Sequence, residues 1–201
     1  MNQYEDFEKY LIENQEAFRV WGLHVSKKIT DALKHELGED LFKNFIKIAA
    51  EPRVKEINSA LGKVARKGYV NPLVQMTDLV GTRFVVLLSK DIDLICKIIE
   101  SSGEFSAKNS KNYLDEIELN PKIFDYQSRH YEIRPTEDMV INEIAISKSI
   151  CCEVQVRTLL QHAYAELVHD SVYKPVVSVP KSAERQIARS MALMETTDDL
   201  F

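Results

Sequence analysis

Apolar side chains recur at helical intervals through the first part of the chain. They are spaced so that they form one stripe along a helix: Phe7, Leu11, Phe18, Trp21, Ile29, Leu33 and Leu37. Gly38 follows this stripe directly, and a glycine in that place is typical of a helix C-terminus. The pattern predicts one or two helices over residues 3–36.

The rest of the chain alternates between strand-like and helix-like patterns. Runs rich in β-branched and aromatic residues predict strands, and apolar residues three or four apart predict helices. The expected elements are a helix at 56–67 ending at Gly68, a turn at Asn71-Pro72, a strand at 82–88, a helix at 92–101 capped by Asp91, strands within 126–133 and 144–157, a helix at 159–172, and a helix after Pro180 with Ile187, Met191 and Met194 on one stripe. Two segments stay open: 42–49 fits a strand or a helix end, and 104–125 is too polar to assign.

Strands that alternate with helices predict an α/β or α+β fold, with a mixed β-sheet flanked by helices. We divide the chain into an N-terminal helical segment at 1–40, a central domain at 41–178 and a C-terminal helix at 179–201. The last residues, Leu200-Phe201, carry no polar tail, which is consistent with a longer natural protein.

Composition narrows the class of protein. The chain has 201 residues, 45% hydrophobic and 28% charged, as expected for a soluble globular protein with one substantial core. A net charge of -5 provides no general attraction to nucleic acid. Cys96, Cys151 and Cys152 have no metal-ligand spacing and are expected to be reduced thiols. The sequence shows neither a signal peptide nor a membrane-spanning run, so we expect a cytoplasmic protein.

The segment E-V-Q-V-R-T at 153–158 combines an apolar and a polar face. Side chains alternate across a strand, so Glu153, Gln155 and Arg157 project from one side, opposite Val154 and Val156. Taken alone, the segment is most simply an amphipathic strand with one wet face. The alternative is that the polar face lines a site.

A second cluster is basic. Arg53, Lys55, Ser59 and Lys63 follow the pattern R-x-K-x3-S-x3-K, and a helix from residue 56 would place Ser59 and Lys63 on one face. Such a set can gather around a polyphosphate, although a solvated basic helix face is the plainer interpretation. The glycines form neither a P-loop nor a Rossmann motif, so side chains would have to hold any phosphates.

Two groups of residues could hold a metal ion. Asp78 lies just before the strand that carries Arg83, and a carboxylate at a strand mouth can bind Mg²⁺, although it can equally form an Asx turn. His162, Glu166 and His169 fall at i, i+4 and i+7 on a predicted helix. They lack a fourth ligand, so we do not favour a metal cluster there.

An aromatic residue and an imidazole mark a third place of interest. In the segment Y-Q-S-R-H, alternation puts Tyr126, Ser128 and His130 on one strand face. This wall suits a nucleobase and its sugar, and Lys122 lies close enough in the chain to reach a phosphate. A half-exposed strand with ordinary polar residues is the alternative.

Taken in order, these segments resemble the synthetase domain of the RelA/SpoT family. The resemblance runs from about residue 45 to residue 174 and rests on R-x-K-x3-S-x3-K at 53–63, D-x-x-G-x-R at 78–83, Y-Q-S-x-H at 126–130, E-V-Q-V-R-T at 153–158, and Tyr173-Lys174. Members of this family transfer pyrophosphate from ATP to the 3′-hydroxyl of GDP or GTP and so make (p)ppGpp. The resemblance implies a nucleotidyltransferase-like synthetase fold, and the chain length is similar to that of a small stand-alone synthetase.

The resemblance also implies a role for each matching position. ATP binding falls to Arg53, Lys55, Ser59, Lys63 and Arg83. Catalysis and Mg²⁺ binding fall to Asp78 and Glu153, with Gln155 beside them in catalysis. Binding of the acceptor nucleotide falls to Lys122, Tyr126 and His130.

The sequence departs from the family pattern mainly on the acceptor side. Asp125 stands where the family commonly has glycine, and its charge is expected to disfavour a phosphate nearby. Tyr164 and Val168-His169 stand where small members often have Trp and Glu-His. The sequence therefore supports ATP as donor better than GDP or GTP as acceptor.

Two alternatives remain open at this point. One is a toxic relative that pyrophosphorylates the 3′ end of tRNA, for which an antitoxin would be a partner. The other is a nucleotide-binding or interaction module without catalytic activity. The sequence leaves the oligomeric state, including a homo-oligomer, and any allosteric ligand undetermined.

Overall fold

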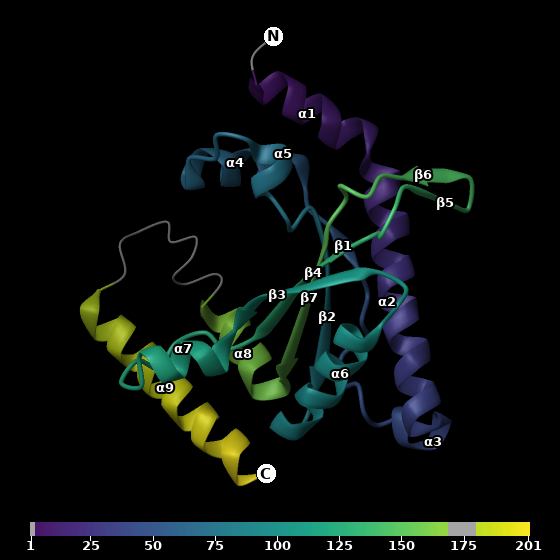
Figure 1. The fold of residues 1–201 in the computed structure, drawn as a ribbon. Helices are drawn as coiled ribbons and strands as arrows, with labels where there is room; N and C mark the ends of the chain where they lie inside the picture. Colours follow the sequence, from purple (N-terminus) through teal and green to yellow (C-terminus); the bar gives the residue numbers. More distant parts are fainter. Residues whose placement is uncertain (1–2, 169–179) are drawn as a thin grey trace.

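A computed structural model describes residues 3–168 and 180–201 of the chain. Within these ranges, five strands form one mixed sheet in the order β1-β2-β7-β4-β3 (Figure 1). The strands are β1 (Arg53–Val54), β2 (Val80–Val86), β3 (Ser106–Asn112), β4 (Arg129–Arg134) and β7 (Cys152–Thr158). Only β2 and β7 among these neighbours run parallel. The predicted mixed sheet flanked by helices is thus confirmed.

The described helices pack around the sheet, and helices also form the first and last described elements of the chain. They are α1 (Gln3–Glu13), α2 (Gln15–Leu37), α3 (Glu39–Phe42), α4 (Ile57–Lys67), α5 (Pro72–Gln75), α6 (Ser89–Ser101), α7 (Tyr113–Leu119), α8 (Leu159–Val168) and α9 (Lys181–Leu200). Figure 1 shows α2 running along one side of the sheet, with α6 beside it. Gly38, at φ 76°, ends α2 in a conformation that glycine adopts without strain. None of the described helices is long and apolar enough to cross a membrane.

The main core lies between the sheet and helices α2 and α6. Trp21 of α2 is fully buried, and its indole Nε1 donates a hydrogen bond to the backbone oxygen of Ile133, 3.2 Å away. From the sheet, Phe84, Val154 and Val156 point into the same core. Burial of such large apolar side chains stabilises a fold by about 1.5–3 kcal/mol each. The opposite face of β2 and β7 is therefore left for polar side chains.

A smaller apolar cluster fixes the C-terminal helix. Tyr164 and Val168 of α8 pack against Met191 of α9, flanked by Ile187 and Met194. The predicted apolar stripe of the last helix is confirmed by this contact. A hairpin of β5 (Met139–Ile141) and β6 (Ile144–Ile146) stands apart from the main sheet.

Some predicted boundaries are wrong. The strand predicted at 82–88 begins at Val80, and the helix predicted from 92 begins at Ser89. Asp91 therefore lies in the first turn of α6, and Leu88 holds the cap position instead. The unassigned segment 104–125 contains β3 and α7.

Three other segments differ from, or complete, the predicted pattern. The segment 42–49 holds the end of α3 and an isolated bridge from Ile48 to Val85. The turn at Asn71-Pro72 opens the short helix α5. The helix predicted at 159–172 is described as far as Val168, and its last residues lie outside the described part.

Candidate active site

Two rows of polar side chains cross the sheet on the face away from α2 and α6. Residues paired in register on neighbouring strands point to the same face. One row runs through Arg53, Gly81 and Glu153, and the next through Arg83, Gln155 and His130. Gly81 has no side chain, so the middle of the first row stays open. A Cβ atom at this position would lie only 3.2 Å from the carbonyl oxygen of Glu153.

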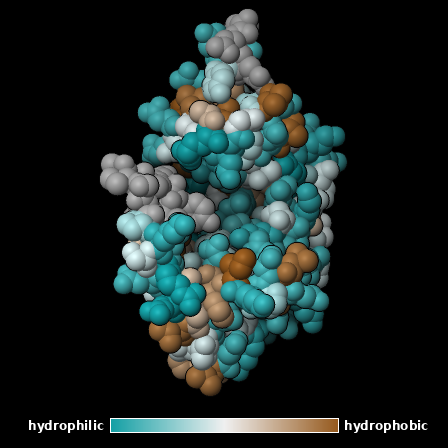
Figure 2. Space-filling model, turned by 90° about the vertical axis from the view of Figure 1, so that its left-hand side faces the viewer, coloured by the Kyte–Doolittle hydropathy of each residue, from teal (hydrophilic) through white to brown (hydrophobic). Residues whose placement is uncertain are grey.

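A cleft of about 410 Å³ lies over these rows. The predicted site residues that line it are Arg53, Lys55, Ser59, Asp78, Arg83, Tyr126, Glu153 and Gln155. Figure 2 shows this face hollowed at mid-height, with mostly hydrophilic residues around the hollow. Lys63 and His130 do not line the cleft, but each contacts a residue that does. The fold thus brings most of the motifs into one place.

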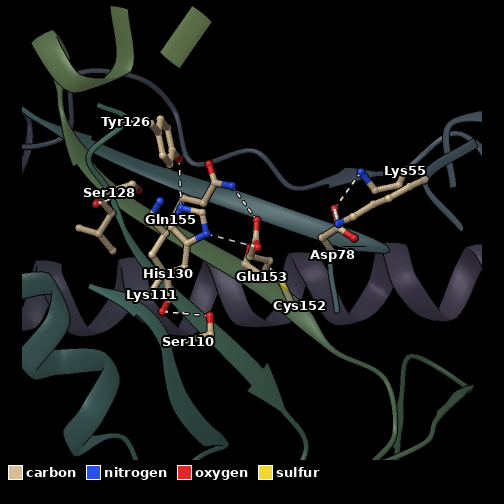
Figure 3. A network of polar contacts seen from close by, with 12 residues as sticks. Lys55, Asp78, Ser110, Lys111, Tyr126, Ser128, His130, Cys152, Glu153 and Gln155 are labelled. Atoms are coloured by element: carbon tan, nitrogen blue, oxygen red, sulfur yellow. Dashed lines mark hydrogen bonds and ion pairs between the residues drawn. The ribbon is translucent and has the colours of Figure 1, made fainter. Parts of the chain in front are cut away.

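One end of the cleft holds a compact ion cluster (Figure 3). The Asp78 Oδ2 atom lies 3.0 Å from the Lys55 ammonium and 2.7 Å from that of Lys63. Burial raises the pKa of Asp78, but the two lysines outweigh burial and hold that pKa below its ordinary value. The Oδ1 atom is buried and accepts no hydrogen bond from the residues that the structure describes. Asp78 is therefore ionised, with one oxygen still available to a ligand.

Glu153 lies in the middle of the cleft within a chain of hydrogen bonds. Gln155 Nε2 donates to Oε2 over 2.6 Å, and His130 Nδ1 lies 3.4 Å from Oε1. Figure 3 marks both contacts with dashed lines. Burial raises the pKa of Glu153, but the contacts with His130 and Gln155 outweigh burial and lower it. The carboxyl is thus ionised at neutral pH, and both of its oxygens have a fixed direction.

Tyr126 forms the wall next to this chain. Its hydroxyl lies 3.0 Å from Nε2 of His130, and the two rings meet edge to face at 5.8 Å. The Lys111 ammonium lies 4.8 Å from the centre of the Tyr126 ring. Sequence reasoning missed Lys111, because only the pairing of β3 with β4 brings it to this place. Lys122, predicted here, is exposed and lines neither this cleft nor the smaller hollow behind Tyr126.

The segment before β4 differs from the predicted strand. Tyr126 and Ser128 precede β4, which begins at Arg129. Ser128 is fully buried, and its hydroxyl donates to the backbone oxygen of Val156. The prediction that Ser128 shares a wall with Tyr126 and His130 is therefore wrong.

Asp125 has a local structural role. Its Oδ1 atom accepts a hydrogen bond from the backbone N–H of Tyr126 over 2.7 Å and from the Tyr164 hydroxyl over 3.4 Å. The carboxylate thus ties the segment that carries Tyr126 to α8. Part of its negative charge is compensated by these donors, so it opposes a neighbouring phosphate less than the sequence alone indicates.

Known proteins match this chain over the segment that builds the cleft. A family model described as "Region found in RelA / SpoT proteins" matches residues 52–177, more than half of the chain. The chain belongs to the RelA/SpoT family. All predicted site residues lie within the matched range.

Two relatives from Bacillus subtilis (strain 168) are distant in sequence. GTP pyrophosphokinase YjbM is 24% identical over 148 residues, which cover 73% of this chain and 66% of the relative. GTP pyrophosphokinase YwaC is 24% identical over 151 residues, covering 73% and 68%. The match thus spans about two thirds of the length of these RelA/SpoT relatives.

Solved structures share the fold over nearly the whole chain. The small alarmone synthetase 1 from Bacillus subtilis, bound to its product pppGpp, superposes with a TM-score of 0.71 at 21% identity, covering 97% of this chain and 94% of that one. A GTP pyrophosphokinase family protein from Streptococcus pneumoniae gives a TM-score of 0.72 at 21% identity, covering 96% and 90%. The chain therefore has the alarmone synthetase fold.

Helix α8 brings Glu166 to the cleft and His162 next to it, a role that the RelA/SpoT motifs did not indicate. Glu166 accepts a hydrogen bond from Arg83 Nη1 over 2.9 Å. His162 Nδ1 lies 3.8 Å from the same Glu166 oxygen. His169 of the disfavoured metal cluster lies outside the described residues. Among those described, no three histidines, cysteines or carboxylates are arranged to hold a metal.

The carboxylates of the cleft fit Mg²⁺ held partly by a substrate. Mg²⁺ prefers oxygen ligands and is commonly bound by one or two carboxylates together with phosphates. Asp78 offers a buried oxygen that has no partner among the described residues, and the ionised Glu153 lines the same cleft. These two residues are the ones that would hold the ion.

Proposed function

We propose that this protein transfers the β,γ-pyrophosphate of ATP to the 3′-hydroxyl of GDP or GTP, giving (p)ppGpp. One observation carries the proposal. An ionised, hydrogen-bonded carboxylate, Glu153, lies in one cleft with a cation cluster around Asp78 and an aromatic wall at Tyr126. Such a cleft can hold a polyphosphate and a ribose hydroxyl next to each other.

The donor would bind at the end of the cleft formed by β1 and α4. Lys55, Ser59 and Lys63 offer two cations and a hydroxyl to the triphosphate, and the arginines Arg53 and Arg83 are the candidate partners of adenine. On binding, phosphate oxygens would replace Asp78 as partners of the two lysines. Mg²⁺, when bound, neutralises charge on the phosphates and so supplies electrostatic stabilisation of the transition state.

Glu153 would orient the acceptor hydroxyl and take its proton. The hydroxyl oxygen forms a bond to the β-phosphorus, and the bond from that phosphorus to the α,β-bridging oxygen breaks, so that AMP leaves. Because the pKa of Glu153 is lowered, the carboxylate is a weak base, so it must hold the hydroxyl in a fixed direction as well as accept its proton. Gln155 and His130 hold it in place for this role.

The relatives support this choice of substrates. The Bacillus subtilis small alarmone synthetase 1 has been solved with its product pppGpp and, separately, with AMPCPP. The acceptor side of this chain departs from the family pattern at Asp125, Tyr164 and Val168, and Val168 is buried with Tyr164 and Met191 in an apolar cluster. This difference makes the 3′-terminal ribose of tRNA the second candidate acceptor.

A transfer assay tests the proposal. The protein is incubated with Mg²⁺ and ATP labelled at its terminal phosphate, and GDP, GTP, AMP and deacylated tRNA are offered separately. We expect the label in GDP or GTP. Label that appears only in tRNA would favour the second candidate, and no transfer to any acceptor would favour a binding module without activity.

A further inference from the structure

Among the described residues that line the cleft, Arg157 is the buried cation to which the RelA/SpoT motifs assigned no role. It lies on β7, two residues beyond Gln155 on the same face, and lines the cleft. Its side chain is only 3% exposed. Within residues 3–168 and 180–201 it forms no hydrogen bond or ion pair, and its Nε atom is buried without a partner.

An unpaired buried guanidinium is costly. Removing such a charge from water costs several kcal/mol, and folded proteins normally compensate the loss with a carboxylate or several acceptors. The partly buried arginines of the sheet have such partners: Arg83 lies 2.9 Å from Glu166, Arg129 lies 2.7 Å from Asp93, and Arg134 lies 3.8 Å from Glu132. Arg157 is the exception, and it faces a solvent-accessible cleft.

The charges around Arg157 are already committed to other partners. Glu166 is 59% exposed and pairs with Arg83, while Glu153 is bonded to Gln155 and His130. Burial lowers the pKa of Arg157, with a further lowering by Arg83, and outweighs the opposing effects of Tyr126, Glu166 and Glu153. Burial and the neighbouring Arg157 likewise lower the pKa of His162. This end of the cleft therefore carries uncompensated positive charge, which a ligand anion would neutralise.

We propose that Arg157 binds a phosphate group of the acceptor substrate. Its assignment to the acceptor rests on the proposed function, whereas its anion binding does not. Arg157 and Glu153 are four residues apart on one strand, so their Cα atoms are separated by about 13 Å. Arg157 lies outside the Lys55–Asp78–Lys63 cluster, and its charged or polar neighbours include Tyr126 and the Arg83–Glu166 pair. A guanidinium can hold a phosphate through two parallel hydrogen bonds.

The stability of the unliganded protein gives the first test. Arg157→Met removes an unpaired charge, so we expect a melting temperature equal to or above that of the wild type. Arg129→Met is the matched control, because it removes a paired arginine from the same sheet and is expected to lower the melting temperature. A fall in Arg157→Met as large as in the control would overturn the proposal, since it would show a structural role.

Ligand binding without turnover gives the second test. Calorimetric titrations compare GDP with guanosine, in the absence of ATP. We expect Arg157→Met to weaken GDP binding at least tenfold and to leave guanosine binding within about twofold, with Arg157→Lys in between. Equal weakening for both ligands, or none for GDP, would contradict the proposal.

Melting temperatures measured with inorganic phosphate test the anion site at Arg157 independently of the proposed function. If the wild type binds neither GDP nor guanosine, the acceptor named above is wrong, and the phosphate-dependent rise in melting temperature decides the role of Arg157. A rise in the wild type and in Arg129→Met that is clearly smaller in Arg157→Met supports the anion site. A rise of the same size in all three proteins contradicts it.

Discussion

The two ends of the cleft differ in how their charges are balanced. At the proposed donor end, Lys55 and Lys63 share the carboxylate of Asp78. At the proposed acceptor end, Arg157 is buried and has no partner among the described residues. The phosphates of a ligand at the donor end must therefore replace Asp78 as the partner of the two lysines. An anion at the acceptor end would instead pair with Arg157 without displacing another group. We expect the charges of the empty donor end to be balanced without a ligand. Ligand binding should therefore stabilise the protein more through the acceptor end than through the donor end.

Removal of the carboxylate between the two ends has the largest expected effect. Glu153→Gln keeps the size of the side chain but removes the charge that orients and deprotonates the hydroxyl. We expect transfer to fall by about 10²–10⁴-fold, which is typical for a lost acid–base group. The affinity for ATP measured by equilibrium titration without Mg²⁺ should change by less than about twofold, because Glu153 lies outside the lysine cluster.

The matched control for this variant is Glu132→Gln. Glu132 lies opposite Glu153 on the neighbouring strand and pairs with Arg134. We expect its transfer rate to stay within a few-fold of the wild type. Loss of activity in Glu132→Gln comparable to that in Glu153→Gln would show that the row of carboxylates, and not Glu153, is required.

The donor end is tested next by Asp78→Asn. This change removes the charge that the lysines share and a ligand for Mg²⁺, so we expect transfer to fall by about 10²–10³-fold. The affinity for Mg²⁺-ATP should fall as well, because Asp78 offers the ion its buried Oδ1 atom. A variant that loses rate but keeps full Mg²⁺-ATP affinity would place Asp78 outside the donor site.

The Asp78→Asn variant also tests how the stability of the fold depends on pH. The folded-state pKa of Asp78 is below its ordinary value, so ionisation of this group stabilises the fold above about pH 4. This contribution is lost as the pH falls through the folded-state pKa. The difference in unfolding free energy between wild type and Asp78→Asn should have its largest value at pH 5–7 and should decrease below about pH 4. A difference that does not depend on pH would contradict the ion cluster.

The aromatic wall gives a smaller effect, confined to the acceptor end. Tyr126→Ala removes the ring, and loss of base stacking costs about 1–3 kcal/mol, so the acceptor KM should rise about 5- to 150-fold. The KM for ATP should be unchanged. Tyr126→Phe keeps the ring and loses the hydroxyl that contacts His130, so a few-fold effect is expected. Equal effects of both variants would exclude stacking as the role of Tyr126.

The smallest expected effect concerns the pair of Arg83 with Glu166. Glu166 is largely exposed, so Glu166→Gln should hardly change stability and should release Arg83 for adenine. We expect ATP affinity to rise about two- to fivefold, a change well below 1.4 kcal/mol. Glu104→Gln, which breaks the exposed pair with Lys28, serves as the control and should leave ATP affinity unchanged. Weaker ATP binding in Glu166→Gln would assign Glu166 itself to the donor site.

The sequence was sufficient for the elements with strong patterns. Strands β2 and β7 have dense β-branched residues, and their alternation correctly separated Val154 and Val156 from Glu153 and Gln155. Strand β3 could not be predicted in this way, because Ser106–Asn112 contains no β-branched residue and its pairing with β4 defines it. Local patterns find the elements that contribute most to the core.

The candidate site was predictable as a set of motifs but not as a set of contacts. Order along the chain indicated Asp78, Tyr126 and Glu153, and the structure places all three in one cleft. The roles of Lys111 and Arg157 depend on what surrounds them in space: one lies over the Tyr126 ring, and the other is buried without a partner among the described residues. Neither property is local in sequence.

The most direct test of the central claim is the balance of products formed by the wild-type protein. If both ends of the cleft serve one pyrophosphate transfer, AMP and a 3′-diphosphorylated acceptor must appear in equal amounts, because each transfer releases one AMP. Chromatography with mass detection measures both products in the same sample. The proposed mechanism predicts a ratio of one AMP to one product that has gained two phosphoryl groups. Release of ADP with a product that has gained a single phosphoryl group, or AMP without a modified acceptor, would contradict it.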